Sequence, residues 1–467
     1  MMKAIIDLVS FINSYVWGLP MIVLLIGTGI WLTLGTRFVQ VRQFCHAWRL
    51  TLRGAFRKDV TEQVPGDITP FQALMTAISA TVGNGNIAGV ATAIAAGGPG
   101  AAFWMWLTGL VGMATKYAEA MLGVKYREER TDGTMAGGSM YFLKNGLRIP
   151  WLGWLFALFG AIAALGIGNM VQANSVALVF RTELGVPDWI TGIVLAVLTW
   201  MVIIGGIKRI GSVAEVLVPV MCVVYFLGGM IIILLKITKV PAAFALIFKS
   251  AFTGHAAVGG FAGAVVRETM RKGVSRGIFS NEAGLGTASI AHAAAQTRDP
   301  VRQGNIAMLG VFIDTIIINT ITTLSIVLTG AFFAEVIVGG KVQGLTSTAL
   351  TAHAFSEVLG PLGGWIVAFG SVTFGYSTLL AWSYYGLKCT DYIFGVRVSL
   401  PYRWVWCFVI FIGAYFSKDL AGIKLIWGIA DILNGAMAIP NLVGLLGMSM
   451  LLFRETLAYT GSSSSEG

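Results

Sequence analysis

The chain alternates long apolar stretches with short polar segments, and the apolar stretches are long enough to cross a membrane. A membrane-spanning helix needs about 20 mostly apolar residues. Eleven segments of the 467-residue chain meet this description, the seventh with interruptions: 16–35, 71–95, 100–122, 152–180, 187–206, 213–235, 256–293, 304–332, 363–385, 403–417 and 424–453. The pattern predicts an all-α polytopic membrane protein with about eleven transmembrane helices.

Composition and charge support this class. Hydrophobic residues make up 56% of the chain and charged residues 12%, whereas soluble domains carry about 25% charged residues. The mean hydropathy is +0.79. The net charge of +10 does not indicate a nucleic-acid partner, because the basic residues lie mostly in short loops beside apolar spans. Their distribution predicts an N terminus outside and a C terminus in the cytoplasm.

The chain ends, the cysteines and the histidines do not alter the prediction of a polytopic membrane protein. The N-terminal "MMKAIIDLVSF" has no small-residue cleavage signature, so we expect it to be retained. Residues 456–467, which end in "GSSSSEG", are expected to form a disordered cytoplasmic tail. The four cysteines and four histidines are scattered, without the spacing of a metal site or a CxxC pair.

One basic segment does not fit the predicted topology. "RETMRKGVSR", which carries Arg267, Arg271, Lys272 and Arg276, falls in the outer half of the seventh span. Its long side chains could snorkel or line an aqueous cavity. Alternatively, the topology is wrong at this point.

A short internal repeat organises the chain. Asn86–Ala93, "NIAGVATA", matches Asn281–Ala288, "NEAGLGTA", at five of eight positions, 195 residues apart. Each copy follows a stretch that we expect to be irregular, "GNG" or "GIFS". Four spans separate the copies, so each copy lies in the first span of a five-span unit, and an odd number of spans inverts the second unit. We expect an N-terminal helix and basic loop (1–70), then repeats at 71–240 and 241–455.

A break in the first helix of each repeat would expose backbone groups that can bind ions or substrate. Free carbonyls at a helix end suit a cation and free amides suit an anion. Gly83 and Gly85 permit unwinding, and Asn86, Ser280 and Asn281 are suitable N-caps for the following half-helices. Coincidence in a chain rich in Gly and Ala is one alternative, and a packing motif formed by Gly85 and Gly89 is another.

Polar residues within other spans are further candidates, because they are costly in a membrane. Gln172, beside Asn169, could contact a ligand or bond to another helix. The adjacent hydroxyls of Ser377 and Thr378 could coordinate a monovalent cation or bond to their own helix. Asp314 and Asp431 could tune ion coupling or be locked by partners. We expect Lys116 and Glu119 to form an i,i+3 pair with a structural role.

Five stretches of the sequence resemble the alanine/glycine:cation symporter family, also called the sodium:alanine symporters. They are "FQALMTAISATVGNGNIAGVATAIAAGGPGAAFWMW", "ATKYAEAMLGVKYR", "GIGNMVQANSVA", "GIFSNEAGLGTASIA" and "LNGAMAIPNL". The resemblance covers about residues 12–455. It implies a leucine-transporter-like fold of two inverted five-helix repeats plus one preceding helix. It also implies sodium-coupled uptake of alanine or glycine across the inner membrane of a prokaryote, by a chain that functions as a monomer.

The resemblance also implies roles for particular residues. The substrate carboxylate would meet backbone amides at the first break, and its ammonium group would meet carbonyls of both breaks. The implied substrate contacts are Thr81, Asn84, Gly85, Asn86, Gln172, Phe279, Ser280 and Asn281. Na+ would be held by carbonyls or hydroxyls of Ser79, Val82, Phe374, Ser377 and Thr378. The family often has threonine at the position of Asn84, so alanine, glycine and larger substrates stay open.

Three alternatives remain beside sodium-coupled transport. A proton-coupled carrier of the same fold would need a titratable site residue, for which Asp314, Asp431 and Glu282 are available. An intramembrane enzyme would need a nucleophile with a base or a metal set, and the sequence lacks such motifs. A passive channel would show flux without saturation. The number of subunits is not predicted.

Overall fold

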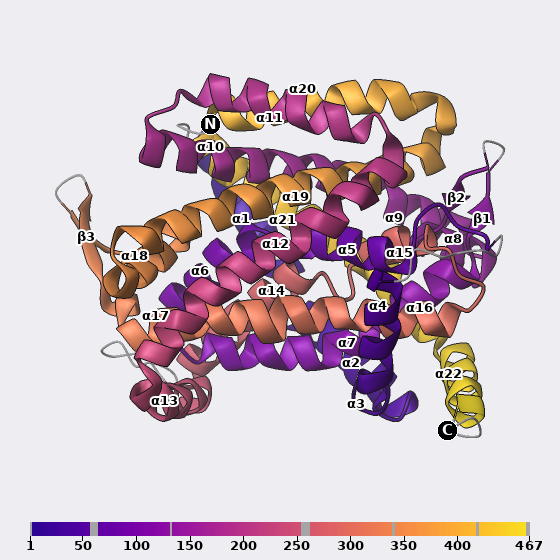
Figure 1. Cartoon of the computed structure of the whole chain (residues 1–467), viewed down its shortest axis with the longest axis horizontal. Helices are drawn as coiled ribbons and strands as arrows, with labels where there is room; N and C mark the ends of the chain where they lie inside the picture. The colour runs from indigo at the N-terminus through magenta and orange to yellow at the C-terminus, as the bar shows by residue number, and fades with distance from the viewer. Residues whose placement is uncertain are drawn as a thin grey trace.

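The chain folds into a bundle of long helices, here described from a computed structural model (Figure 1). The description covers residues 2–56, 64–130, 133–253, 262–338, 341–416 and 420–463. Most long helices lie roughly along the horizontal axis of Figure 1, with the β1–β2 hairpin and the C terminus at one end. Helix α13 and the β3–β4 hairpin lie at the opposite end.

The elements up to residue 235 include two π-helical segments, η1 and η2. In order they are α1 (Met2–Val16), α2 (Leu19–Gly35), α3 (Val39–Arg42), α4 (Phe44–Phe56), α5 (Pro70–Thr81), η1 (Gly85–Gly89), α6 (Val90–Gly97), α7 (Ala101–Lys125), β1 (Glu128–Glu129), β2 (Met135–Ala136), α8 (Ser139–Asn145), α9 (Pro150–Ala163), η2 (Ala164–Met170), α10 (Val171–Leu184), α11 (Asp188–Ile203) and α12 (Gly206–Leu235).

The remaining elements include one more π-helical segment, η4, and three 3₁₀ turns. In order they are η3 (Ile237–Lys239), α13 (Val240–Thr253), α14 (Ala262–Asn281), α15 (Thr287–Ala293), α16 (Pro300–Val311), η4 (Phe312–Ile318), α17 (Asn319–Thr329), η5 (Ala331–Phe333), β3 (Glu335–Val338), β4 (Lys341–Gly344), α18 (Ser347–Leu359), α19 (Pro361–Phe394), η6 (Val396–Val398), α20 (Ser399–Tyr415), α21 (Leu420–Gly447) and α22 (Ser449–Ser463).

Local sequence explains where the helices of the site begin. Helix α5 starts with a capping box: the Thr69 side chain accepts from the Gln72 backbone amide, and the Gln72 side chain accepts from the Thr69 backbone amide. Pro70 occupies the first helical position. The Asp299 side chain accepts from two backbone amides at the start of α16, directly before Pro300. The first cap fixes the start of α5, which leads into η1, and the second fixes the start of α16, which packs on α7.

The helices approach one another closely through small residues. Helix α14 packs on α7, and a Cβ added to Gly277 would lie 2.3 Å from Thr108 Oγ1. A Cβ added to Gly273 would lie 2.3 Å from the Ala101 carbonyl oxygen. Packing of this kind is typical of helices in membranes, where close backbone approach supplies the attraction.

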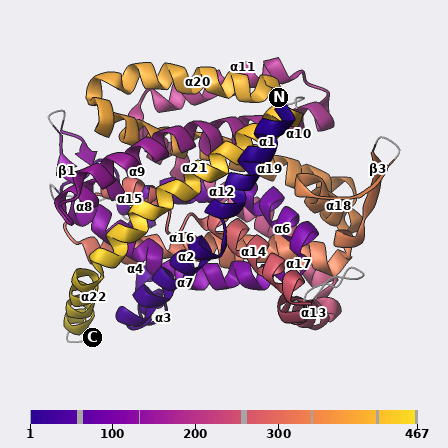
Figure 2. The same ribbon diagram turned by 180° about the vertical axis from the view of Figure 1, so that it is seen from behind.

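Other helix pairs complete the bundle. Helices α11 and α20 lie side by side along one edge, and α1 lies against α21 (Figures 1 and 2). Two antiparallel hairpins extend beyond the helices: β1 pairs with β2, Glu128 opposite Ala136, and β3 pairs with β4, Glu335 opposite Gly344.

Seven described helical segments are long and apolar enough to span a membrane. They are Ile5–Gly35, Pro150–Leu184, Gly206–Leu235, Pro300–Thr329, Pro361–Phe394, Val396–Tyr415 and Leu425–Gly447. The other four predicted spans coincide with helices that are broken, shorter or less apolar. The all-α polytopic fold is confirmed, and the number of eleven spans remains a prediction.

Several predicted boundaries were wrong. The predicted first span, 16–35, coincides with α2, and the apolar helical segment extends back to Ile5 across the turn at Trp17 and Gly18. The last span ends at Gly447, because the helix stops there and α22 follows as a separate helix. The tail predicted to be disordered from residue 456 is helical to Ser463. Helix α22 is anchored on α7, since Thr456 Oγ1 lies 2.7 Å from the Tyr117 hydroxyl.

Candidate functional site

The first helix break lies where the sequence predicts it. Helix α5 ends at Thr81, and Val82, Gly83 and Asn84 separate it from η1. The Gly83 amide donates to Asn86 Oδ1 at 2.9 Å, while the Asn86 amide donates to the Gly83 carbonyl at 3.0 Å. Asn86 therefore braces the unwound turn from within instead of capping the following half-helix, so its predicted N-cap role was wrong.

The second break lies later in the chain than predicted. The stretch "GIFS" is helical, because α14 continues to Asn281, and the break covers residues 282–286. Glu282, Gly284 and Gly286 have φ of +55°, +94° and +84°, a backbone region that ends a right-handed helix. Gly286, rather than Ser280 or Asn281, is the residue before α15.

Two buried charges on α7 satisfy the second break. Lys116 Nζ donates to the Asn281 carbonyl at 2.9 Å. Glu119 Oε1 accepts from the amides of Gly284 and Gly286 at 2.9 and 3.0 Å, and from Asn441 Nδ2 at 2.8 Å. A cation thus meets a helix C terminus and an anion meets free amides, as the helix dipole favours. The predicted direct Lys116–Glu119 pair is not the arrangement found here.

The first break has a corresponding carboxylate. Asp314 on η4 accepts from Asn86 Nδ2 at 2.7 Å and from Ser280 Oγ at 2.9 Å, so it joins the two breaks. Asn319 belongs to the same cluster, with Oδ1 3.0 Å from Asn86 Nδ2. Glu119 and Asp314 are separated by the same 195 residues as Asn86 and Asn281. The internal repeat therefore extends to the carboxylates that hold each break.

The residues predicted to hold Na+ meet between α5 and α19. The hydroxyls of Ser377 and Thr378 lie 3.3 and 3.2 Å from the Ser79 carbonyl oxygen, and both also donate to the Phe374 carbonyl. A Cβ added to Gly83, next to Val82, would lie 2.8 Å from Thr378 Oγ1. Carbonyl and hydroxyl oxygens from an unwound helix and a facing helix form the kind of ligand set that suits Na+.

The predicted substrate residues divide into two groups. Asn84 Nδ2 donates to Gln172 Oε1 at 3.1 Å, and Asn84 Oδ1 is buried without a hydrogen-bond partner among the described residues. A Cβ added to Gly85 would lie 3.4 Å from the Phe279 ring and 3.6 Å from Ser280 Cα. Gly85 of the first repeat therefore faces Phe279 and Ser280 of the second, and the adjacent Asn84 bonds to Gln172.

Two predicted substrate residues use their side chains elsewhere. Thr81 Oγ1 donates to the Ile78 carbonyl of its own helix at 3.2 Å. Asn281 Nδ2 donates to Thr315 Oγ1, and Asn281 Oδ1 accepts from the Ala283 amide. Asn169 also bonds between helices, to the Trp406 carbonyl. The side chains of these residues therefore stabilise the helices.

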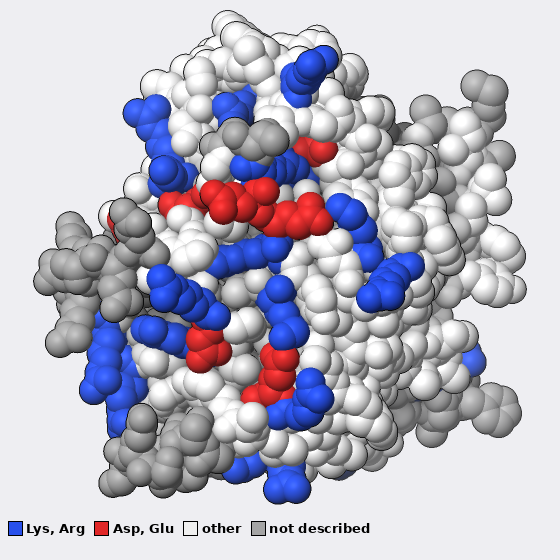
Figure 3. All heavy atoms as spheres, turned by 90° about the vertical axis from the view of Figure 1, so that its right-hand side faces the viewer, with Lys and Arg blue, Asp and Glu red and all other residues white. Residues whose placement is uncertain are grey.

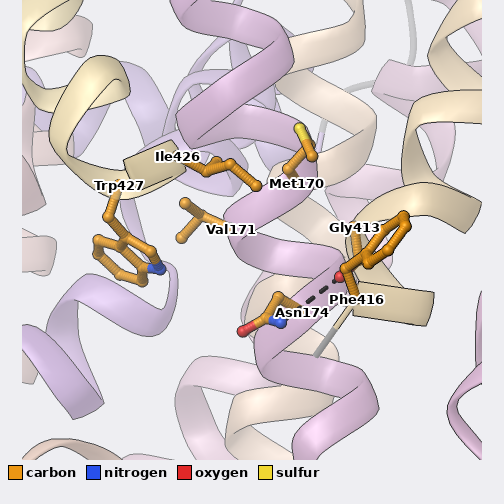
Figure 4. Close-up of a pocket in the computed structure, with 7 residues that line it drawn as sticks. All are labelled: Met170, Val171, Asn174, Gly413, Phe416, Ile426 and Trp427. Atoms are coloured by element: carbon orange, nitrogen blue, oxygen red, sulfur yellow. Dashed lines mark hydrogen bonds between the residues drawn. The ribbon is translucent and has the colours of Figure 1, made fainter. Parts of the chain in front are cut away.

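A small pocket beside the site is too narrow for a substrate. It lies between α10, α20 and α21, and Asn174 reaches across it toward the Gly413 carbonyl (Figure 4). Its volume of about 10 Å³ corresponds to roughly one water molecule. Trp427 lines this pocket and also stacks on Phe279, with ring centroids 6.2 Å apart.

A similar fold occurs in a solved structure. A manganese transporter of Eremococcus coleocola aligns with a TM-score of 0.51 and 12% identity, covering 82% of this chain and 80% of that one. At this identity the similarity concerns the fold alone.

Sequence relatives cover nearly the whole chain. The sodium/alanine symporter AgcS of Methanococcus maripaludis is 50% identical over 460 residues, 97% of each chain. The probable sodium/glutamine symporter GlnT of Bacillus subtilis is 34% identical, covering 98% of this chain and 92% of the relative. The sodium:alanine symporter family matches residues 2–466, and this chain belongs to that family.

Proposed function

We propose that this protein is a secondary active transporter that carries Na+ and a small neutral amino acid, alanine or glycine, into the cell together. The observation that carries the proposal is the meeting of Ser79, Phe374, Ser377 and Thr378 oxygens beside the first helix break. That break also presents Asn84, whose Oδ1 lacks a partner among the described residues. An ion site and a polar substrate site thus share one unwound segment.

The roles of the site residues follow from this arrangement. Na+ would be held by the carbonyls of Ser79, Val82 and Phe374 and the hydroxyls of Ser377 and Thr378. The substrate carboxylate would bind the free amides around Asn84 and Gly85, with Gln172 orienting Asn84. The ammonium group would bind carbonyls of Thr81, Phe279 and Ser280. Asn86 and Asn281 would shape the two breaks, and Asp314 would couple them by holding Asn86 and Ser280 together.

Coupling between Na+ and substrate would arise because Na+ orders the first break. The Ser377 and Thr378 hydroxyls donate to nearby carbonyls. Na+ would draw those carbonyls and hydroxyls onto itself and so fix α5 against α19. Substrate would then bind a break that is already ordered, which raises its affinity by the same factor as substrate raises that of Na+. Alternating access would follow from rocking of repeats 71–240 and 241–455 about the shared site.

Two variants of this function remain candidates. The relative GlnT is described as a probable sodium/glutamine symporter, so glutamine is a second possible substrate. Asp314 supplies a carboxylate at the site, so proton coupling is a second possible driving force. Uptake under a pH gradient without Na+ would distinguish this driving force from Na+.

We also propose the orientation and location. The face that carries the β1–β2 hairpin and the C terminus is rich in Lys and Arg (Figures 1 and 3), which supports a cytoplasmic position. The N terminus would then lie outside, in the cytoplasmic membrane of a prokaryote. The site is built within one chain, so we expect a monomer to function.

One experiment tests the function directly. Purified protein in proteoliposomes should accumulate labelled L-alanine or glycine when an inward Na+ gradient is present, and D-alanine and glutamine should be compared in the same assay. Uptake that does not respond to Na+ would refute sodium coupling. Flux that does not saturate with substrate would refute a carrier.

A further inference from the structure

A polar cavity lies between residues of α1, α14 and α21. Its volume is about 240 Å³, whereas one water needs about 10–15 Å³. Arg271, Lys272, Arg276 and Asp431 supply its charges, and Asn13 is among its polar lining. Three of the four basic residues that did not fit the predicted topology, Arg271, Lys272 and Arg276, therefore line a polar cavity, and Arg267 does not.

The charges of this cavity are not equivalent. Arg271 Nη2 lies 2.8 Å from Glu268 Oε1, and Lys272 Nζ lies 3.6 Å from the same oxygen. Among the described side chains, neither Arg276 nor Asp431 has an ion-pair partner within 4.0 Å. One guanidinium and one carboxylate are thus left facing the same polar space.

Arg276 is also adjacent to the proposed substrate site. Its guanidinium lies over the Phe279 ring at 5.4 Å, and Phe279 stacks on Trp427. A Cβ added to Gly85 of the first break would lie 3.4 Å from the Phe279 ring, and one added to Gly89 would lie 4.0 Å from Arg276 Cδ. The cavity therefore lies directly beside the first break.

We propose that this cavity is a docking site for a zwitterionic amino acid before it reaches the first break. The Arg276 guanidinium would bind the substrate carboxylate, and the Asp431 carboxylate would bind the ammonium group. The proposal rests on the proposed transport function and adds a second site to it. A zwitterion satisfies both unpaired charges at once, whereas a lone anion or cation leaves one unpaired in a partly buried space.

The charges can be removed one at a time. Arg276→Met and Asp431→Asn keep much of the side-chain volume, and Arg267→Met is the matched control. Arg267 lies on the same helix, is exposed and is not among the cavity residues. Each cavity variant removes one charge-assisted bond to the substrate and should therefore raise the KM for alanine roughly tenfold or more. The maximal rate at saturating alanine and Na+ should change little, because the first break is untouched.

The kinetic outcomes separate the explanations. Arg276→Met with the same KM as Arg267→Met would overturn the docking site. A fall in maximal rate with unchanged KM would assign Arg276 and Asp431 to the conformational change, and would also overturn it. Absence of Na+-driven alanine uptake by the unmodified protein would instead refute the proposed function.

A binding measurement does not depend on transport. Ser275→Cys places a thiol in the cavity, and its labelling by a charged methanethiosulfonate can be followed without Na+, with the unmodified chain as background. Alanine should slow this labelling, and isopropylamine or propionate alone should not. The protection should be lost when Arg276→Met is added. Equal protection with and without Arg276→Met would overturn the proposal even if transport is normal.

Discussion

The Thr378 hydroxyl provides the sharpest test of the Na+ site. Thr378 is buried on α19, and its Oγ1 lies 2.9 Å from the Phe374 carbonyl oxygen and 3.2 Å from that of Ser79. Thr378→Val removes this oxygen and nearly preserves the shape of the side chain. The Phe374 carbonyl retains its helical partner, so the fold should lose no more than about 1 kcal/mol.

The loss of Na+ binding free energy in Thr378→Val should be larger than the loss of fold stability. A hydrogen bond or ligand contact to a charged group contributes about 1.5–3 kcal/mol, and about 1.4 kcal/mol corresponds to a tenfold change in affinity. The Na+ concentration that gives half-maximal alanine uptake should therefore rise about 10-fold or more. Thr378→Ser keeps the hydroxyl and should restore most of the affinity. Removing both hydroxyls, with Ser377→Ala and Thr378→Ala, should abolish Na+ stimulation.

The matched control lies on the same helix. The Thr373 hydroxyl bonds to the Phe369 and Gly370 carbonyls of α19, at 2.8 and 3.3 Å, rather than to the carbonyls of Ser79 and Phe374. Initial rates of labelled alanine uptake in proteoliposomes, measured across a series of Na+ concentrations, compare Thr378→Val with Thr373→Val. An unchanged Na+ dependence in Thr378→Val, equal to that of Thr373→Val, would refute the assignment of this oxygen to the ion.

Three further substitutions test other parts of the site. Asn84→Thr shortens the side chain and removes its bond to Gln172, so glutamine should compete better with labelled alanine, while unchanged competition would remove Asn84 from substrate selection. Glu119→Gln should lower stability by about 1–3 kcal/mol because the charge that holds the second break is lost. Thermal unfolding in detergent, compared with Glu129→Gln at an exposed position, measures this. Gly277→Ala should cost about 1–3 kcal/mol through its clash with Thr108, whereas Gly27→Ala, with nothing within 4 Å of the added Cβ, should be neutral in the same measurement.

The sequence predicted the class of fold because hydropathy and helix breaks are local signals. The family match confirms a transporter rather than an enzyme. The first break was placed correctly, since two glycines in "GNG" disfavour a helix strongly. The second break was misplaced, because "GIFS" contains only one glycine and α14 gains packing on α7 through Gly277. Tertiary packing here outweighed the local preference.

The roles of Lys116 and Glu119 could not be predicted from their neighbours in sequence. Their partners lie about 165 residues away, at Asn281, Gly284 and Gly286, so spacing along α7 suggested only a mutual pair. One signal was available in the sequence. The 195-residue repeat places Glu119 opposite Asp314, and applying it beyond the short motif would have indicated that both carboxylates serve the breaks.

The two breaks are held in different ways, and this difference bears on how the site works. The second break is fixed by two full charges, Lys116 and Glu119, whose bonds go directly to its backbone. The first break is braced by the neutral Asn86 side chain, and the Ser377 and Thr378 hydroxyls beside it bond to carbonyls that Na+ could also use. Neutral bonds cost less to exchange than buried charged ones. Ligand-dependent rearrangement should therefore concentrate at the first break, with the second break serving as its rigid counterpart across Asp314.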